Sequence, residues 1–430
     1  IVKNQTLKFN FKFKMSKKIK IKVVLFSGIF YLSLITGFYF NESLNGGAYG
    51  DWVSSSAVIK DFEINFLDTL NNYDNYQHRH SPVYLIFLSL FLKLDYSFDL
   101  IRLIHLHFSI LLIFVFYKCL ELKFEKFEST LLILLAFVIF FSPTFRSLSI
   151  WPDSRIPGLL FFTTSIYFFL KYEKTKSEKF LWLTSSFLIV SSYISPNFSL
   201  FFFLFFYKIF EQISFPRILL FFSFNILCAI PFLFYLFVMD VNFLSSAQTP
   251  SSNNQTFSLN FNFANKILII SSIIFFHLIP ILLYKNYFIN FLNFIKKKII
   301  LILLIFVPSI LFFNYEMGYT GGGIFFHLSN YIFENNNFFY LISFIGLSFV
   351  LFLCNLDVRN LYFFLILILT NIQNTIYHKY YEPLLIIIFF TILKNVNADS
   401  IIRDKKIIYS FYAVSIFFIA TKIYKNYYLI

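Results

Sequence analysis

The expected fold depends on one stretch, HRHSPVYLIFLSLFLKL at residues 78–94, in which a polar start leads into a short apolar run. As a helix, residues 83–94 would extend about 18 Å, whereas the hydrocarbon core of a bilayer is about 30 Å thick. If this run crossed a membrane, every later basic loop would change sides. We therefore expect it to dip into the membrane or lie at its surface. A short true span supported by its neighbours is the alternative.

The composition is that of a membrane protein. Of the 430 residues, 58% are hydrophobic and 13% are charged, and the mean hydropathy is +0.71. A soluble domain carries about 25% charged residues. The net charge of +14 arises from Lys and Arg in short runs between apolar segments, as the positive-inside rule requires, so we expect no nucleic-acid partner.

Apolar segments recur along the whole chain. A spanning helix needs about 20 apolar residues. We expect an all-α, polytopic bundle of about 13 spans, with interfacial helices in the first outer loop, residues 41–99. The candidate spans are 21–40, 100–118, 129–145, 156–171, 179–195, 197–210, 216–238, 265–284, 298–313, 337–354, 359–377, 382–394 and 406–425.

Basic residues indicate which side of the membrane each loop faces. They gather before the first candidate span and after the second, fourth, sixth, eighth and twelfth, so alternating spans place them on one side, the cytoplasmic side. Residues 1–20 form a basic cytoplasmic N-terminus, in which 1–14 read as an extension before Met15. The outer face then collects the loops 41–99, 143–155, 239–264, 314–336 and 377–382.

The first candidate for chemistry is Asp51, in Gly50-Asp51-Trp52, just beyond the first span. A carboxylate near the interface can act as a general base if partial burial raises its pKa toward the working pH. The alternative is a helix N-cap, because Asp commonly stands before a helix.

The second candidate is the polar segment at residues 78–81, just before the short apolar run. Pro82 suits the first turn of a helix, which would aim His78, Arg79 and His80 at a helix N-terminus, a place that favours anions. We expect a phosphate or substrate contact. A structural role and a metal site remain open, because His-x-His alone is not specific for a metal.

The third candidate lies in residues 142–155. Arg146 or Arg155 could hold a phosphate through two parallel hydrogen bonds. Asp153 could hold a sugar hydroxyl, a metal or one of these arginines.

A fourth candidate, His378-Lys379-Tyr380, stands at a late outer turn and suits head-group recognition. The alternative is an aromatic belt with a snorkelling Lys. A fifth candidate is the run Gly321-Gly322-Gly323. It would either let the backbone approach a ligand closely or form a flexible hinge.

Together these residues resemble the GT-C class of polyprenyl-phosphate-sugar glycosyltransferases. That class has an early Asp in its first outer loop, a His-Pro-Pro-Leu-like start to a short apolar segment, a Ser-Pro, an Arg-x-x-Ser and an Asp, and a late Arg/Lys-Tyr before Pro. The matching residues here are Asp51, His80-Ser81-Pro82, Ser142-Pro143, Arg146 to Ser149, Asp153, Lys379-Tyr380 and Pro383. Ser81 replaces the first Pro, and Trp52 stands where an acid is common. The resemblance covers roughly residues 20–210 and 377–383.

The resemblance implies a catalytic module at 21–210 and variable helices at 211–430. It implies inverting transfer of a sugar from a polyprenyl phosphate to a lipid or glycan acceptor, at the non-cytoplasmic face of a bacterial cytoplasmic membrane. Asp51 would be the base and Asp153 a second catalytic acid. The residues expected to contact substrate are His78, His80, Arg146, Arg155, His378, Lys379 and Tyr380. We expect no cofactor, with a divalent metal as the open alternative.

Two other classes remain in view. A lipid-linked oligosaccharide polymerase or ligase would depend on Arg or His in a large late outer loop. A transporter would carry acids inside its spans or internal repeats, whereas the acids here gather in loops.

Overall fold

The computed structural model describes residues 17–44, 47–76, 78, 80–210, 213–241, 262–316, 318, 321–371 and 375–428. Within these ranges all regular secondary structure is helical and none is strand, which confirms the expected all-α class. The extension expected before Met15 and the candidate Arg79 lie outside the described residues.

The helices follow one another with short connections. The first part of the chain contains α1 (Lys17–Tyr39), α2 (Gly47–Ile64), α3 (Phe66–Asn71), α4 (Pro82–Leu92), α5 (Phe98–Lys123), α6 (Ser129–Phe137), α7 (Pro143–Ile150), α8 (Arg155–Thr175), α9 (Lys179–Ile194), α10 (Phe201–Phe210) and α11 (Phe215–Phe237). The second part contains α13 (Phe263–Leu278), α14 (Lys285–Leu311), α15 (Ile324–Phe333), α16 (Asn337–Leu356), α17 (Arg359–Leu369), α18 (Glu382–Thr391), α19 (Ala398–Arg403) and α20 (Lys405–Tyr428).

Several of these helices are those of a multi-pass membrane protein. Five are long and apolar enough to cross a bilayer, namely α5, α11, α13 with its 3₁₀ extension to Leu283, α16 and α20. A bent pair, 129–141 and 143–150, would make a sixth. Each of the thirteen expected segments contains a helix, but α9, α10 and α17 have no more than 16 residues each.

The bend between α6 and α7 has a local cause. Ser142 has extended backbone angles, and its hydroxyl accepts a hydrogen bond of 2.9 Å from the N–H of Phe145. Pro143 follows it at the first helical position, where its missing N–H is tolerated. The chain therefore turns by 71°. The short helix α7 ends three residues before Asp153.

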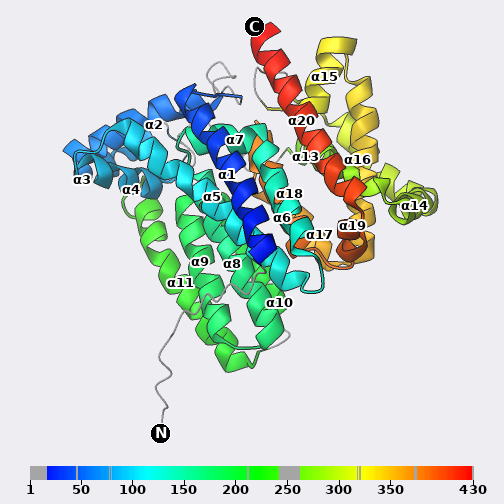
Figure 1. Cartoon of the computed structure of the whole chain (residues 1–430), viewed down its shortest axis with the longest axis horizontal. Helices are drawn as coiled ribbons and strands as arrows, with labels where there is room; N and C mark the ends of the chain where they lie inside the picture. The colour runs from blue at the N-terminus through cyan, green and yellow to red at the C-terminus, as the bar shows by residue number, and fades with distance from the viewer. Residues whose placement is uncertain are drawn as a thin grey trace.

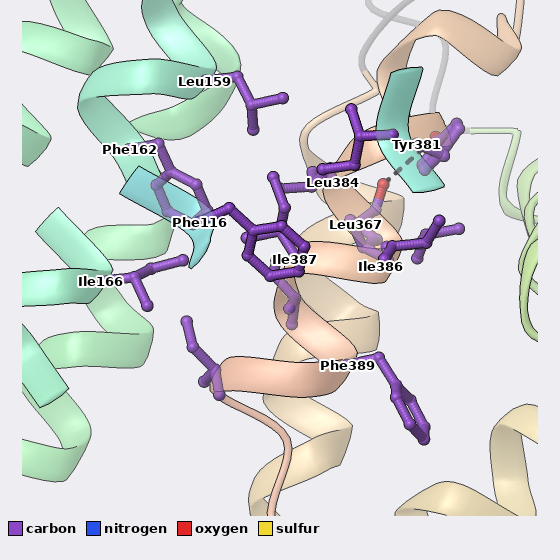
Figure 2. Packing of buried hydrophobic residues seen from close by; sticks show 14 of the residues in the cluster. Phe116, Leu159, Phe162, Ile166, Leu367, Tyr381, Leu384, Ile386, Ile387 and Phe389 are labelled. Carbon is purple, nitrogen blue, oxygen red and sulfur yellow. Dashed lines mark hydrogen bonds between the residues drawn. The ribbon is translucent and has the colours of Figure 1, made fainter. Parts of the chain in front are cut away.

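Helix α18 lies at the centre of the molecule. All ten of its residues are buried, and it packs against α5, α7, α8 and α13. Figure 2 shows Phe116 of α5 and Phe162 of α8 beside Leu384 and Ile387 of α18. Between membrane helices such close packing is a main source of association. It fixes the N-terminal end of α18, directly after the 3₁₀ turn η5 (His378–Tyr380).

The other elements are grouped around this helix (Figure 1). Helices α5, α8 and α9 pack side by side, and α2, α3 and α4 lie at one end of that group. Helices α13, α14, α15, α16 and α20 stand on the other side of the molecule. The short apolar run within residues 78–94 forms α4, a helix of only 11 residues with Pro82 in its first turn and Ser81 as its cap.

Candidate functional site

Four side chains from four separate segments meet at one place, which we call the carboxylate–lysine cluster. They are Asp51 of α2, His80 before α4, Asp153 between α7 and α8, and Lys379 of η5. One possible ligand atom from each of Asp51, His80 and Asp153 lies within 4.8 Å of the other two. The Nζ of Lys379 lies 2.7 Å from Oδ2 of Asp51 and 3.9 Å from Oδ2 of Asp153.

Asp51 is the accessible member of the cluster. It lies inside α2 and not at its start, so the N-cap alternative is wrong. Its neighbour Trp52 is buried, whereas 39% of the Asp51 side chain is exposed. We expected partial burial to raise the pKa of Asp51, and burial does act in that direction. Lys379 and His80 outweigh it, however, and leave the pKa below its usual value. The carboxylate is therefore ionised at neutral pH and open to a substrate.

Asp153 is the enclosed member, with only 2% of its side chain exposed. The backbone N–H of Arg155 donates a hydrogen bond of 2.8 Å to its Oδ1. Burial raises the pKa of Asp153, but the neighbouring His80 ring and the charges of Lys379 and Arg155 hold it well below the usual range. Its Oδ2 has no hydrogen-bond partner among the described residues, and lies 3.9 Å from both Nε2 of His80 and Nζ of Lys379. Gaps of that size suit a bridging water or hydroxyl.

His80 is held from both sides. Its Nδ1 is hydrogen-bonded to the hydroxyl of Ser154 at 3.0 Å, and its carbonyl accepts a bond of 2.7 Å from the hydroxyl of Tyr73. Burial lowers the pKa of His80, so the ring is neutral at neutral pH.

His78 supports the cluster from behind. Its Nε2 lies 3.0 Å from the hydroxyl of Ser55, which in turn donates to the backbone carbonyl of Asp51 at 2.7 Å. Burial lowers the pKa of His78 to about 3. Ser55 was not among the expected site residues, although its place one helical turn after Asp51 was the available signal.

Arg155 and Tyr380 border the cluster. The guanidinium of Arg155 lies 3.5 Å from the centre of the Tyr380 ring, and its Nε is 4.0 Å from Oδ1 of Asp153. Within the described part of the chain this buried Nε has no hydrogen-bond partner. A stacked guanidinium with an unused donor is suited to a phosphate oxygen.

Arg146 is used elsewhere. Its guanidinium donates to both carboxylate oxygens of Glu42, at 2.7 and 2.6 Å, and to the hydroxyl of Ser33 at 3.0 Å. The pair joins α7 to the end of α1, and so Arg146 does not meet the cluster as we had expected. Glu42 was not considered from the sequence, although it is the first acid after the first span.

His378 also has a partner set of its own. Its Nε2 accepts a hydrogen bond of 3.0 Å from the N–H of Ile324, and its Nδ1 lies 3.3 Å from Nε2 of His277. Its ring packs 5.0 Å from the ring of Phe418. These contacts hold η5 in place, so that the next residue, Lys379, reaches the cluster.

The glycine run contributes to the same support. Gly321, Gly322 and Gly323 all have positive φ, at 90°, 76° and 83°, which glycine adopts without a Cβ penalty. The N–H of Gly322 donates to the carbonyl of Ile376 at 2.9 Å. The run therefore turns tightly against the segment that leads into Lys379.

The arrangement combines an ionised, partly open carboxylate with buried cationic side chains. Such a site can accept a proton at Asp51 while Lys379 and Arg155 stabilise negative charge that develops nearby. No protein-family model, no curated protein and no solved structure matches this chain.

Proposed function

We propose that the chain is a membrane glycosyltransferase, of the GT-C type, that moves a sugar from a polyprenyl phosphate to an acceptor hydroxyl. The observation that carries the proposal is the ionised Asp51 carboxylate, partly exposed and 2.7 Å from the Lys379 ammonium, with Arg155 and Asp153 beside it. Base and cations are thus within one small site, as displacement of a phosphate by a hydroxyl requires.

The reaction would proceed as a single displacement with inversion. The acceptor oxygen forms a bond to the anomeric carbon while its proton passes to Asp51. The bond from the anomeric carbon to the phosphate oxygen breaks, and its electron pair leaves with the polyprenyl phosphate. Arg155 would take the phosphate role expected of Arg146, because its Nε is free to donate and the Arg146 donors are occupied by Glu42 and Ser33.

An apolar pocket supports a lipid-linked donor. A cavity of about 500 Å³ lies between α9, α10, α11 and the end of α17. It is lined mainly by apolar side chains, among them Leu188, Phe222 and Ala229. One wall, near Pro196, packs on the first turn of α8, the helix that begins with Arg155. We assign this pocket to the start of the polyprenyl chain.

The proposed placement has about thirteen spans, a cytoplasmic N-terminus, and α2 to α4 at the outer surface. This placement is supported by the fact that the loops expected outside and the basic loops expected inside gather at two different places in the structure. Asp51, Asp153 and Lys379 come from three loops expected outside, and they meet. Basic residues expected inside meet around another cavity, of about 540 Å³, lined in part by Lys123, Lys394 and Arg403.

A transfer assay tests the function directly. Purified protein in lipid nanodiscs is incubated with a panel of polyprenyl-phosphate sugars, and release of polyprenyl phosphate and formation of glycoside are followed by mass spectrometry. We expect one sugar to be transferred, and Asp51→Asn to lower kcat by about 10²–10⁴-fold, the usual contribution of a general base.

Asp61→Asn is the matched control, because Asp61 lies on the same helix and its carboxylate accepts a bond only from the exposed Tyr76 among the described contacts. It should retain full activity. Normal transfer by Asp51→Asn would remove Asp51 from the mechanism.

A further inference from the structure

We infer that Lys379 is the resident cation of the carboxylate–lysine cluster and fills the place that a divalent metal would otherwise take. The inference deepens the proposed function, on which its catalytic meaning rests. It predicts a site that works without a metal ion and becomes a metal site when Lys379 is removed.

The donor atoms alone would suit a metal. Two carboxylates and an imidazole are common ligands of Zn²⁺ and Mn²⁺, and those of Asp51, Asp153 and His80 lie within 4.8 Å of one another. Bonds of about 2.1 Å to such ligands would place the ion within about 5 Å of the ammonium, because the Lys379 Nζ lies 2.7 Å from Oδ2 of Asp51. The two positive groups would compete for the same carboxylates.

The charges in the cluster are already balanced. Asp51 and Asp153 carry two negative charges, and the Lys379 and Arg155 side chains carry two positive ones. The Lys379 ammonium lies 2.7 Å from Oδ2 of Asp51 and 3.9 Å from Oδ2 of Asp153, so both carboxylates stabilise its charge. Lys379 therefore stays charged, and an added divalent ion would leave an uncompensated excess in an enclosed site.

The position of the ammonium is also built into the fold. Only 13% of the Lys379 side chain is exposed. The N–H of Ile324 donates a hydrogen bond to the preceding residue, His378, and the buried helix α18 begins three residues after Lys379. A metal ion would have to displace a side chain that is held by its neighbours. The residues present thus do not fit a divalent metal while Lys379 is in place.

Binding of Mn²⁺ alone to the full-length protein in nanodiscs, followed by electron paramagnetic resonance, tests the inference without any sugar substrate. We expect the wild-type cluster to bind no Mn²⁺ and Lys379→Met to gain one bound ion per chain. Adding Asp51→Asn to Lys379→Met should remove the gained ion. Lys394→Met is the matched control, because Lys394 pairs with Glu173 in the basic cavity.

Two results would overturn the inference. One is a wild-type protein that binds Mn²⁺ at a site that Asp51→Asn abolishes. This measurement does not depend on a Lys379 variant that folds. The other is a folded Lys379→Met or Lys379→Gln protein, with unchanged elution on size exclusion, that gains no ion. If Lys379→Met gains the ion but the wild-type protein transfers no sugar in any assay, the inference about Lys379 stands and the proposed function is refuted.

Discussion

Lys379 donates a hydrogen bond of 2.7 Å to Asp51 across a separation of 328 residues in the sequence. The contact joins α2 to the turn before the central helix α18. It also sets the protonation state of both groups, because each favours the charged form of the other. The two residues should therefore be judged as a pair when either is altered.

The two arginines should separate in their effects. Arg155→Lys keeps the charge but loses the planar group that stacks on Tyr380. We expect it to raise the KM for a lipid-phosphate sugar by about tenfold or more, equivalent to about 1.4 kcal/mol or more, with little change in thermal stability. Steady-state kinetics with varied donor concentration measures this. An unchanged KM would exclude Arg155 from phosphate binding.

Arg146→Lys should behave in the opposite way. It weakens the enclosed bidentate pair with Glu42, whose side chain is 17% exposed. Breaking a buried pair completely costs about 3–5 kcal/mol, so we expect Arg146→Ala to lower the unfolding temperature clearly and Arg146→Lys to lower it less. Differential scanning fluorimetry in detergent checks the order, and donor KM should stay constant in Arg146→Lys. A raised KM there would return Arg146 to the site.

His78 should make stability depend on pH. Its folded pKa of about 3 lies below the unfolded value of 6.5, since burial disfavours the charged ring. Below pH 6.5 the unfolded chain binds a proton that the folded chain does not, so this contribution to stability is present above pH 6.5 and is lost progressively as the pH falls toward 3. We expect the unfolding temperature to fall between pH 6.5 and 4 more steeply in the wild type than in His78→Asn. Parallel profiles would contradict the assignment.

His378 should act as a positioning residue for Lys379. In His378→Leu the N–H of Ile324 loses its acceptor, at a cost of about 1–3 kcal/mol, and η5 loses its anchor. We expect kcat to fall by about tenfold, which corresponds to about 1.4 kcal/mol in the barrier. In His378→Asn an amide oxygen can accept the same bond, so partial recovery of kcat is the result that distinguishes positioning from general destabilisation. Equal activity of the two variants at equal stability would contradict it.

Topology mapping checks the placement in the membrane. Reporters fused after residues 60, 120 and 150 should lie outside, inside and outside respectively. The reason is that α2 and the start of α8 lie on the side of the carboxylate–lysine cluster, whereas the end of α5 lies beside the cavity lined by Lys123, Lys394 and Arg403. A reporter at 60 that faces the cytoplasm would invert the proposed orientation of Asp51.

Local chemistry made part of this structure predictable. Pro82 marked the start of α4, and its 11 residues are too few to span a bilayer, as the length of the apolar run indicated. The sidedness of the basic runs grouped the loops of Asp51, Asp153 and Lys379 on one face, and the structure brings these three together. Hydrophobic length and charge placement are properties that a sequence carries directly.

Partner choice was not predictable in the same way. Arg146 and Arg155 are alike in type and stand nine residues apart, yet one pairs with Glu42 and the other stacks on Tyr380. Arg146 lies inside α7, whereas Arg155 begins α8 after the turn at 151–154. The neighbours that each of these two helices meets do not follow from composition. His378 was expected to contact substrate, but its ring accepts a hydrogen bond from Ile324 while the adjacent Lys379 contacts Asp51. Adjacent residues in a 3₁₀ turn point to different neighbours, and the sequence does not show which neighbour each one meets.

The burial of α18 has a consequence for synthesis. Its ten residues are enclosed by α5, α7 and α8, which leave the ribosome earlier, and by α13. The space between the early helices therefore stays unfilled until residues 382–391, in the last eighth of the chain, have been made. Until then Lys379, which stands three residues before α18, cannot reach Asp51 and Asp153, so the carboxylate–lysine cluster is completed only when the end of the chain is made.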